Sequence, residues 1–321
     1  MYKKISAVVV PTLIAVGIIA YMLYRVWGDL LEALQHMIPI YLVIGIVICL
    51  SAWWLRGWRY HYILASLTYN VPVIVATACI FVSQTVNLVV PARLGDFVRI
   101  FILKHDYNTS YSEGISSIVV ERVFDIVTVA LLGGVALLFI PNVPSWFYTV
   151  IFVPLLVGIA FFVFLVFSGK LTTKNKYISI ILTMLEEIRR ASLTLKSILV
   201  LSFSSIVIWL LDVLVCVSVV MMFQQQIPFA VVLLAIVIGN LVKAVPLTPG
   251  GVGTYELSLA FTFELYGVAP AIAFLIAVID HLIKNIVTLV GGVISIYFLG
   301  DWVIPTIRQA IHERSKRGKV S

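Results

Sequence analysis

Long apolar stretches recur along this sequence, and several come close to the ~20 residues that a helix needs to cross a hydrocarbon layer. Apolar side chains make up 62% of the 321 residues and charged side chains only 12%, against roughly 45–50% and about 25% in soluble globular proteins. The stretches are continuously apolar and do not alternate, which argues against a membrane β-barrel. The sequence therefore predicts an all-α polytopic integral membrane protein and excludes a soluble enzyme, a secreted disulfide scaffold and a disordered chain.

Windows of high apolarity predict where the helices lie. A further segment, 177–197, repeats apolar residues at helical spacing with charged residues off that stripe, which is typical of a helix lying in the membrane interface. We place this helix in a cytoplasmic connector, 170–198, and expect it to be an ordinary linker. The apolar windows themselves cover residues 5–27, 38–55, 71–90, 115–140, 147–167, 199–223, 229–245, 252–267 and 271–299.

The net charge of +7 comes from an uneven distribution of Lys and Arg. Most of the 22 basic residues fall in segments that the helix order puts on one side of the membrane, including a basic tail at 305–321. This bias is the positive-inside signature, so we expect a multi-pass protein of the cell membrane with both termini in the cytoplasm. A helix ending near residue 55 would also leave Arg56 and Arg59 in the cytoplasm. The basicity therefore indicates orientation, and no nucleic-acid partner is expected.

Counting sides of the membrane predicts two helical hairpins that enter and leave on the same side. Residues 60–114 must begin and end inside, with the hairpin at 71–104, and residues 229–266 must begin and end outside. Each segment contains a cluster of Pro and Gly that no continuous helix would carry. The sequence thus predicts six spanning helices plus two re-entrant hairpins in one transmembrane domain, 1–321.

The two hairpins indicate an internal repeat of opposite orientation. Pro91 and Gly95 recur as Pro249 and Gly253 at a common offset. Inverted repeats whose broken helices meet near the midplane are typical of transporters. Broken helices at membrane depth survive only within protein or beside a water-filled cavity, so a cavity is expected between the breaks; the alternative is a pair of purely structural kinks. The repeats are expected at 38–140 and 199–299.

A first cluster of charged residues follows the first break. Ions in a spanning helix cost roughly 2.5–3.5 kcal/mol each at the centre unless they are paired or hydrated. One interpretation is an internal salt-bridge network, for example between Arg122 and Asp96. The other is that Arg93, with Arg99 or Arg122, binds a phosphate, for which the guanidinium fork is well shaped. The cluster consists of Arg93, Asp96, Arg99, Glu121, Arg122 and Asp125.

A second cluster lies in the second half of the chain. Asp280 and Lys284 stand one turn apart on a helix and can partly neutralise each other. His281 and the carboxylates are either buried structural groups or a proton-coupling relay. Glycines at the second break, namely Gly250, Gly251 and Gly253, would let a ligand approach the backbone closely. The charged members of this cluster are Asp212, Lys243, Glu256, Asp280, His281 and Lys284.

Several motifs of catalysis are missing from the sequence. It has no phosphate-binding loop of the P-loop type, no zinc-protease motif and no nucleophile elbow. Its three cysteines lie in apolar stretches without metal spacing, so no metal site and no cofactor are expected. Movement of a substrate fits these residues better than catalysis, and we expect the chain not to be an enzyme.

Three separated motifs resemble those of the lysylphosphatidylglycerol synthase transmembrane family, also called flippase-like domain proteins. In bifunctional members this region moves aminoacylated phosphatidylglycerol between leaflets, and polyprenyl-phosphate-linked sugars are another suggested cargo of stand-alone members. No synthetic domain is expected here, nor aminoacyl transfer. The family often has Glu where this sequence has Asp96. The motifs are Asn87-Leu-Val-Val-Pro-Ala-Arg-Leu-Gly-Asp-Phe-Val-Arg99, Val120-Glu-Arg-Val-Phe-Asp125 and Pro246-Leu-Thr-Pro-Gly-Gly-Val-Gly-Thr-Tyr-Glu256.

Together these features predict a translocase for a lipid, either an anionic phospholipid or a polyprenyl phosphate. The headgroup would enter the cavity while the tails stay in the bilayer, and the inverted units would expose the site to each leaflet in turn. A secondary transporter of a small anion and a non-transporting accessory subunit of a membrane glycosyltransferase are the alternatives. A homo-oligomer is left open. The expected headgroup ligands are Arg93, Arg99, Arg122, Lys284, Gly250, Gly251 and Gly253.

Overall fold

The computed structural model describes residues 2–90, 93–169, 171, 173, 175–245, 247–300 and 302–305. Within these ranges the chain is all-helical and contains no strand. The first half comprises α1 (Tyr2–Val26), α2 (Leu30–Gln35), α3 (Ile40–Ser66), α4 (Val73–Val89), α5 (Gly95–Tyr107) and α6 (Tyr111–Leu137). The second half comprises α7 (Ser145–Ser168), α8 (Lys176–Ser192), α9 (Leu195–Met222), α10 (Phe229–Ala244), the short 3-10 turn η1 (Pro249–Gly251), α11 (Thr254–Leu265) and α12 (Pro270–Leu299).

Four of the described helices, α3, α7, α9 and α12, are long and apolar enough to cross a membrane. α6 is 27 residues long, but it carries three charged residues near its middle and so is less apolar. Large apolar side chains cover much of the outer surface, most clearly on α7. A multi-pass helical membrane protein is therefore confirmed, while the count of six spanning helices stays a prediction.

Local chemistry explains where the helices begin. The hydroxyl of Ser110 accepts a hydrogen bond of 3.1 Å from the backbone N–H of Glu113 at the start of α6, and Thr194 does the same for Ser197 in α9 at 3.1 Å. Such caps satisfy N–H groups that lack a partner within the helix. α4 and α10 begin directly after prolines, Pro72 and Pro228, whose fixed φ suits a helix start.

Each of the two segments expected to form a hairpin contains a pair of short helices. α4 and α5 have 17 and 13 residues, and α10 and α11 have 16 and 12. At 1.5 Å per residue none of them reaches the roughly 30 Å of a hydrocarbon core. Each pair is interrupted where the sequence has its Pro and Gly cluster, although Pro91 and Pro246 themselves lie outside the described residues. The re-entrant course of these two segments stays a prediction.

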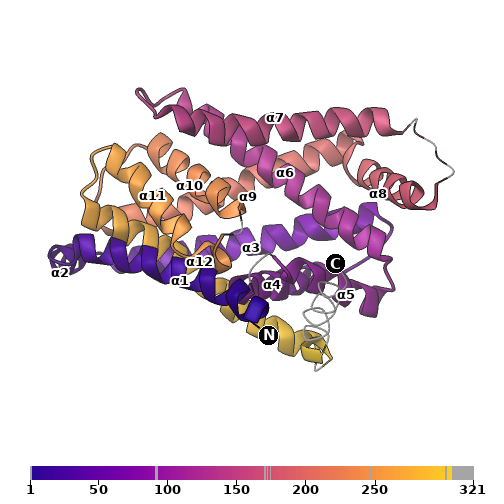
Figure 1. Cartoon of the computed structure of the whole chain (residues 1–321), viewed down its shortest axis with the longest axis horizontal. Coiled ribbons are helices and arrows are strands. Elements are labelled where there is room, and N and C mark those ends of the chain that lie inside the picture. Colours follow the sequence, from indigo (N-terminus) through magenta and orange to yellow (C-terminus); the bar gives the residue numbers. More distant parts are fainter. Residues whose placement is uncertain are drawn as a thin grey trace.

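The hairpins lie towards opposite ends of the molecule (Figure 1). α10 and α11 lie in the same half of the view as α2, whereas α5 lies in the half that also holds α8. Their breaks nevertheless meet, because η1 packs against α4. A Cβ added to Gly250 would come within 2.8 Å of the Leu88 side chain, which shows how closely the second break approaches the end of α4.

The long helices hold this arrangement together through close contacts. α3 packs along α9, α4 along α12, and α6 along α10. A Cβ at Gly57 of α3 would overlap Thr77 of α4, and one at Gly95 of α5 would overlap the backbone carbonyl of Ser83. Small residues at such crossings let helix backbones approach closely, as is common in membrane proteins.

Some sequence-based expectations differ from the structure. The helix expected to end at residue 55 continues to Ser66 as α3, so that boundary was wrong, and Arg56 and Arg59 lie within the helix and not beyond its end. The expected connector helix is α8, which ends at Ser192 and is followed at once by α9. α2 was not predicted. Apart from Pro305, the basic tail 305–321 lies outside the described residues.

Candidate functional site

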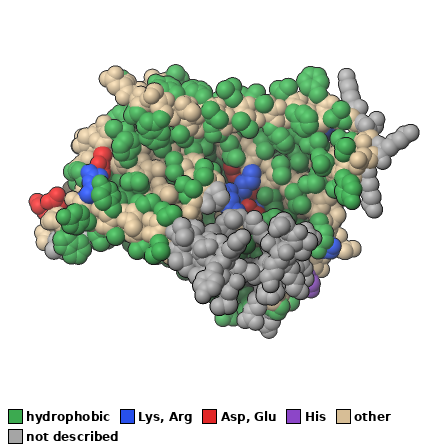
Figure 2. Space-filling model, viewed as in Figure 1, with side chains coloured by type: hydrophobic (Ala, Val, Ile, Leu, Met, Phe, Trp, Pro, Cys, Tyr) green, Lys and Arg blue, Asp and Glu red, His purple; other side chains and the backbone are tan. Residues whose placement is uncertain are grey.

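A cavity of about 350 Å³ lies where the two helix breaks meet. Side chains from both hairpins line it, together with residues of α3, α6, α9 and α12. On the face shown in Figure 2, blue and red side chains are visible in a hollow about midway along the molecule, with green apolar surface on both sides. Five cationic and three acidic residues line the cavity: Arg56, Arg93, Arg122, Lys243, Lys284, Glu121, Asp125 and Asp212.

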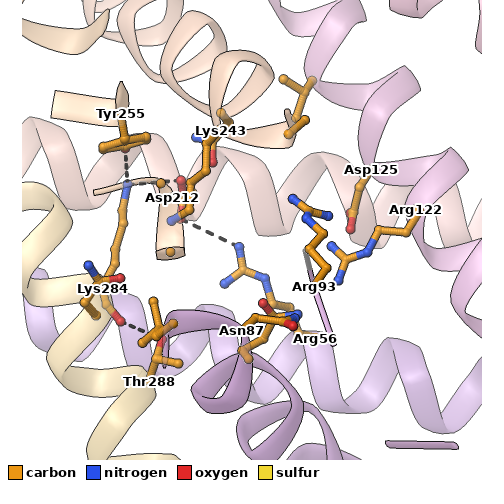
Figure 3. A pocket seen from close by; sticks show the side chains of 18 of the residues that line it. Arg56, Asn87, Arg93, Arg122, Asp125, Asp212, Lys243, Tyr255, Lys284 and Thr288 are labelled. Carbon is orange, nitrogen blue, oxygen red and sulfur yellow. Dashed lines mark hydrogen bonds and ion pairs between the residues drawn. The ribbon is translucent and has the colours of Figure 1, made fainter. Parts of the chain in front are cut away.

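Arg93 lies in the first break and is distinguished by its lack of partners. Its backbone is left-handed, with φ 54°, a conformation that few non-glycine residues adopt. Its half-buried side chain lines the cavity, and Figure 3 shows it beside Arg122. No described residue forms a hydrogen bond or an ion pair with the Arg93 guanidinium. Arg93 therefore brings an unpaired positive charge to the cavity.

Side chains of the first hairpin hold the break in which Arg93 lies. The Asn87 amide oxygen accepts a hydrogen bond of 2.7 Å from the backbone N–H of Gly95, the first residue of α5. Its amide nitrogen donates to Asp96 at 3.3 Å, and Ser83 donates to the same carboxylate oxygen at 3.1 Å. Arg122 of α6 lies 3.4 Å from this Asp96 oxygen. The ion pair expected between Arg122 and Asp96 is thus confirmed, and Arg122 also lines the cavity.

Two more arginines are neutralised deep in the protein. The Arg99 guanidinium is fully buried and lies 2.8 Å from Glu121, with the Tyr60 ring 4.3 Å from its central carbon. Arg59 donates to both carboxylate oxygens of Asp125, at 2.6 and 3.1 Å. Glu121 and Asp125 lie four residues apart on α6, and each neutralises a different arginine. Arg99 does not line the cavity, so its expected role as a headgroup ligand is corrected to that of a buried structural ion.

Arg56 lines the cavity but was not predicted as a site residue. Its guanidinium carbon lies 5.5 Å from the Trp53 ring centroid and 5.9 Å from that of Trp209, within the range of cation–π interactions. It also lies 3.7 Å from Asp212. The sequence signal for this residue was a pair of arginines, at positions 56 and 59, about one turn apart in a segment rich in tryptophan. We interpreted these arginines as charges that follow the end of a spanning helix.

The second charged cluster forms a connected group on the opposite wall (Figure 3). Lys284 lies 2.9 Å from Asp280 and 3.0 Å from Asp212. The Tyr255 hydroxyl donates to Asp280 at 2.7 Å and accepts from Lys284 at 3.2 Å. The expected Asp280–Lys284 pair is confirmed, and Lys284 lines the cavity although Asp280 is fully buried. Three helices, α9, α11 and α12, are therefore joined by one ionic group.

Lys243 faces the cavity and is connected to the second break through a histidine. Its ammonium donates to His281 Nε2 at 3.0 Å, and His281 Nδ1 lies 2.8 Å from Glu256. Because Lys243 can only donate, Nε2 must accept and Nδ1 must carry the proton, which makes His281 neutral. The second oxygen of Glu256 accepts from the backbone N–H of Gly253 at 2.7 Å. His281 and Glu256 thus connect the cavity wall to the break.

The glycines of the second break have different positions. Gly250 and Gly251 line the cavity, with φ 61° and 76°. Gly253 does not line it; a Cβ there would meet Ala15 and Ile18 of α1 within 3.1 Å. The expected backbone contact with a ligand is therefore open to the first two glycines, whereas Gly253 allows α1 to pack. Among the described side chains, no group of His, Cys, Asp and Glu could hold a metal ion.

The fold and cavity define a polytopic helical membrane protein with a charged site between two broken helices, and comparison with known families agrees. The family model described as the lysylphosphatidylglycerol synthase TM region matches residues 8–292. The chain therefore belongs to this family, as its three motifs predicted.

Similar proteins are known from archaea. A protein named glycosyltransferase AglD, from Haloferax volcanii, is 30% identical over 99% of this chain, which spans only 58% of that protein's length. A UPF0104 membrane protein of Methanocaldococcus jannaschii is 28% identical over 67% of the chain and 94% of its own length. Another, from Methanothermobacter thermautotrophicus, is 24% identical over 90% of the chain and 93% of its own length.

Proposed function

We propose that this protein is a lipid translocase that moves a phosphate-bearing lipid between the leaflets of the cell membrane. The headgroup enters the cavity and the tails remain in the bilayer. The cargo is an anionic phospholipid or a polyprenyl-phosphate-linked lipid, and both termini of the protein are cytoplasmic.

The observation that carries this proposal is the position of the charged cavity. Charged side chains are exposed between apolar surfaces on the face seen in Figure 2, where a bilayer would contact the protein. A site for a soluble anion needs an opening to water at the ends of the molecule, whereas a lateral opening admits a headgroup whose tails stay in lipid. The unpaired Arg93 gives this opening its attraction for a phosphate.

The pattern of helix contacts supports an inverted repeat, with units at 38–140 and 199–299. The first unit corresponds to α3, α4, α5 and α6, and the second to α9, α10, α11 and α12. If the units exchange places, the contact of α4 with α12 becomes that of α10 with α6, and α3 with α9 maps onto itself; all of these contacts exist. Two hairpins that enter from opposite sides are the basis of alternating access in many transporters.

Within this proposal the charged residues divide into ligands and supports. Arg93, Arg122 and Lys284 contact the headgroup, together with the backbone of Gly250 and Gly251. The supporting groups keep those ligands in place through ion pairs and hydrogen bonds; of them, Glu121 and Asp125 also line the cavity. The supporting and proton-coupling candidates are Asp96, Glu121, Asp125, Glu256, Asp280 and His281.

One observation favours a second candidate function, that of an accessory subunit. The relative from Haloferax volcanii is named a glycosyltransferase, and this chain matches only part of its length. The matched region would then bind the lipid-linked substrate of such an enzyme without moving it. In either case the chain binds a phosphate-bearing lipid and is itself not the catalyst.

Leaflet exchange of a labelled lipid distinguishes these functions. Purified protein is reconstituted into vesicles that contain phosphatidylglycerol with a fluorescent label, and an impermeant quencher reports the outer-leaflet fraction over time. We expect exchange well above the protein-free rate, and we expect Arg93→Ala to abolish it without loss of folded protein. Arg25→Ala is the matched control, because Arg25 is an exposed arginine paired with Glu264 and lies outside the cavity.

Three other outcomes would count against translocation. Exchange at the protein-free rate for both phosphatidylglycerol and a labelled polyprenyl-phosphate-linked sugar contradicts the proposal. Lipid binding that depends on Arg93 without exchange would favour the accessory role. Uptake of inorganic phosphate into the vesicles, with no lipid exchange, would favour a small-anion transporter.

A further inference from the structure

The buried charges around the cavity are almost, but not completely, balanced. Seven cations and six carboxylates lie in the cavity wall, in direct contact with groups of that wall or, for Glu256, in contact with it through His281. An unbalanced charge in a low-dielectric interior costs several kcal/mol, so such clusters are normally neutral. The cations are Arg56, Arg59, Arg93, Arg99, Arg122, Lys243 and Lys284, and the carboxylates are Asp96, Glu121, Asp125, Asp212, Glu256 and Asp280.

Five of the cations have a carboxylate within 4 Å. On α3, α5 and α6, three arginines, Arg59, Arg99 and Arg122, have one carboxylate each, at distances of 2.6, 2.8 and 3.4 Å. On the opposite wall, Lys284 and Arg56 share the carboxylates of Asp212 and Asp280. These five cations and five carboxylates neutralise one another within the protein.

The sixth cation, Lys243, is balanced through His281. Because the hydrogen-bond directions make this histidine neutral, it transmits the interaction between Lys243 and Glu256 without adding a charge. Glu256 is therefore the counter-charge of Lys243, although the two side chains do not touch. That assignment leaves Arg93 as the one cation of this cluster with no counter-charge among the described side chains.

We propose that the cavity selects a headgroup with a single net negative charge, a phosphodiester, over a phosphomonoester with two charges and over a zwitterion. This inference rests on the proposed binding of a phosphate-bearing lipid and names its class. One negative charge next to Arg93 completes the balance of the cluster. A second negative charge would be uncompensated in a low-dielectric site, and a zwitterion would leave the charge of Arg93 unbalanced.

Three labelled lipids with identical acyl chains test the charge rule. Phosphatidylglycerol carries one negative charge, phosphatidylcholine none, and phosphatidic acid close to two at about pH 7.4. In reconstituted vesicles we expect phosphatidylglycerol to exchange at least about tenfold faster than either of the others. The free energy that corresponds to this ratio of rates is only a modest fraction of the cost of one unpaired charge at short range. Soluble glycerophosphoglycerol, the same headgroup without tails, should compete weakly, which separates a lipid ligand from a free phosphodiester.

An isosteric variant should change the preference in a known direction. Glu256→Gln keeps an oxygen for the Gly253 N–H but removes the counter-charge of Lys243, so the cluster then carries two unpaired cations. We expect this variant to prefer phosphatidic acid. Arg93→Gln removes the charge that has no partner among the described side chains of the cluster, and we expect this variant to bind phosphatidylcholine as well as phosphatidylglycerol. Glu264→Gln, outside the cavity, should keep the original order.

Binding measured separately from exchange keeps this inference distinct from the proposed function. The shift in Tm of detergent-purified protein is recorded with each lipid. If no lipid is exchanged but phosphatidylglycerol stabilises the protein most, and Glu256→Gln reverses the order, translocation is wrong and the charge rule holds. Equal or greater stabilisation of the unmodified protein by phosphatidic acid overturns the charge rule, whatever the exchange rates are.

Discussion

The break between α4 and α5 is held by side chains, whereas the break between α10 and α11 is built from glycine backbone. In the first, Asn87 bonds to the start of α5 and an arginine occupies the left-handed position. In the second, glycines occupy all the described left-handed positions, and the nearby Lys243 is bonded to His281. The first break therefore supplies an unpaired charge, and the second supplies close contact with its neighbours. The two breaks thus differ in the charge and in the backbone that they present.

The largest expected effect concerns how each hairpin is attached to the helix that follows it. Arg99 ties α5 to Glu121 of α6 by a buried ion pair, whereas Tyr255 ties α11 to Asp280 of α12 by a hydroxyl. Arg99→Met leaves a buried carboxylate unpaired, so we expect a loss of roughly 3–5 kcal/mol of stability. Tyr255→Phe should cost only about 1–3 kcal/mol. Unfolding of both variants in detergent, followed by circular dichroism, checks this order, and equal losses would contradict it.

The next effect concerns the two asparagines that precede the breaks. Asn87 satisfies the Gly95 N–H across the first break, whereas Asn240 bonds only to Ile236 of its own helix, at 2.9 Å. Asn87→Ala leaves a buried donor without a partner, so we expect a loss of about 1–3 kcal/mol. Asn240→Ala should cost less than ~1 kcal/mol. The same unfolding assay compares them, and a larger loss for Asn240→Ala would show that the second break also depends on its asparagine.

A smaller effect is expected at the left-handed positions. Gly250→Ala forces a side chain into a backbone with φ 61° beside Leu88, which costs about 1–2 kcal/mol. Arg93→Gly leaves its backbone unstrained and should retain or slightly raise stability, while it removes lipid exchange. Measuring stability and exchange for both variants separates backbone strain from loss of charge. Normal exchange in Arg93→Gly would remove the functional distinction between the breaks.

The smallest effect is expected outside both breaks. Arg25 and Glu264 pair at 3.1 Å on the exposed end of the second hairpin, where the arginine side chain is 41% accessible. Exposed pairs contribute about 0–1 kcal/mol, so Arg25→Gln should leave both stability and exchange nearly unchanged. A strong loss of exchange in this variant would mean that the contact between α1 and α11 controls access to the cavity.

The helix breaks could be predicted because Pro and Gly act locally. The cluster around Gly250 identifies the second break without any knowledge of the fold, and the spacing of Asp280 and Lys284 is enough to predict their ion pair. The break and the ion pair could be predicted because each depends on residues that are close together in the sequence.

The wrong predictions concern residues whose partners are distant in sequence. Arg56 and Arg59 were expected to lie beyond the end of a spanning helix, where arginines are common. In the structure Arg59 is neutralised by Asp125, 66 positions away, and bonded to Ser205, 146 positions away. Arg99 was expected in the cavity for its charge alone, but its partner on α6 draws it into the core. Such ion pairs depend on which helices pack together, and local sequence patterns do not predict that packing.

Helices of the first half of the chain pack against helices of the second half, and this packing affects the order in which the protein assembles during translation. α4 packs along α12 and α6 along α10, so the first half of the chain leaves the ribosome before its main partners have been made. Arg59 likewise waits for Ser205 of α9. Helices can enter the bilayer one by one and associate afterwards. The cavity wall, however, is complete only when α12 is inserted, because Lys284 and Thr288 of this helix line the cavity. A nascent chain that stalls before α12 should therefore be recognised by quality control as unfinished, however well its earlier helices have been inserted.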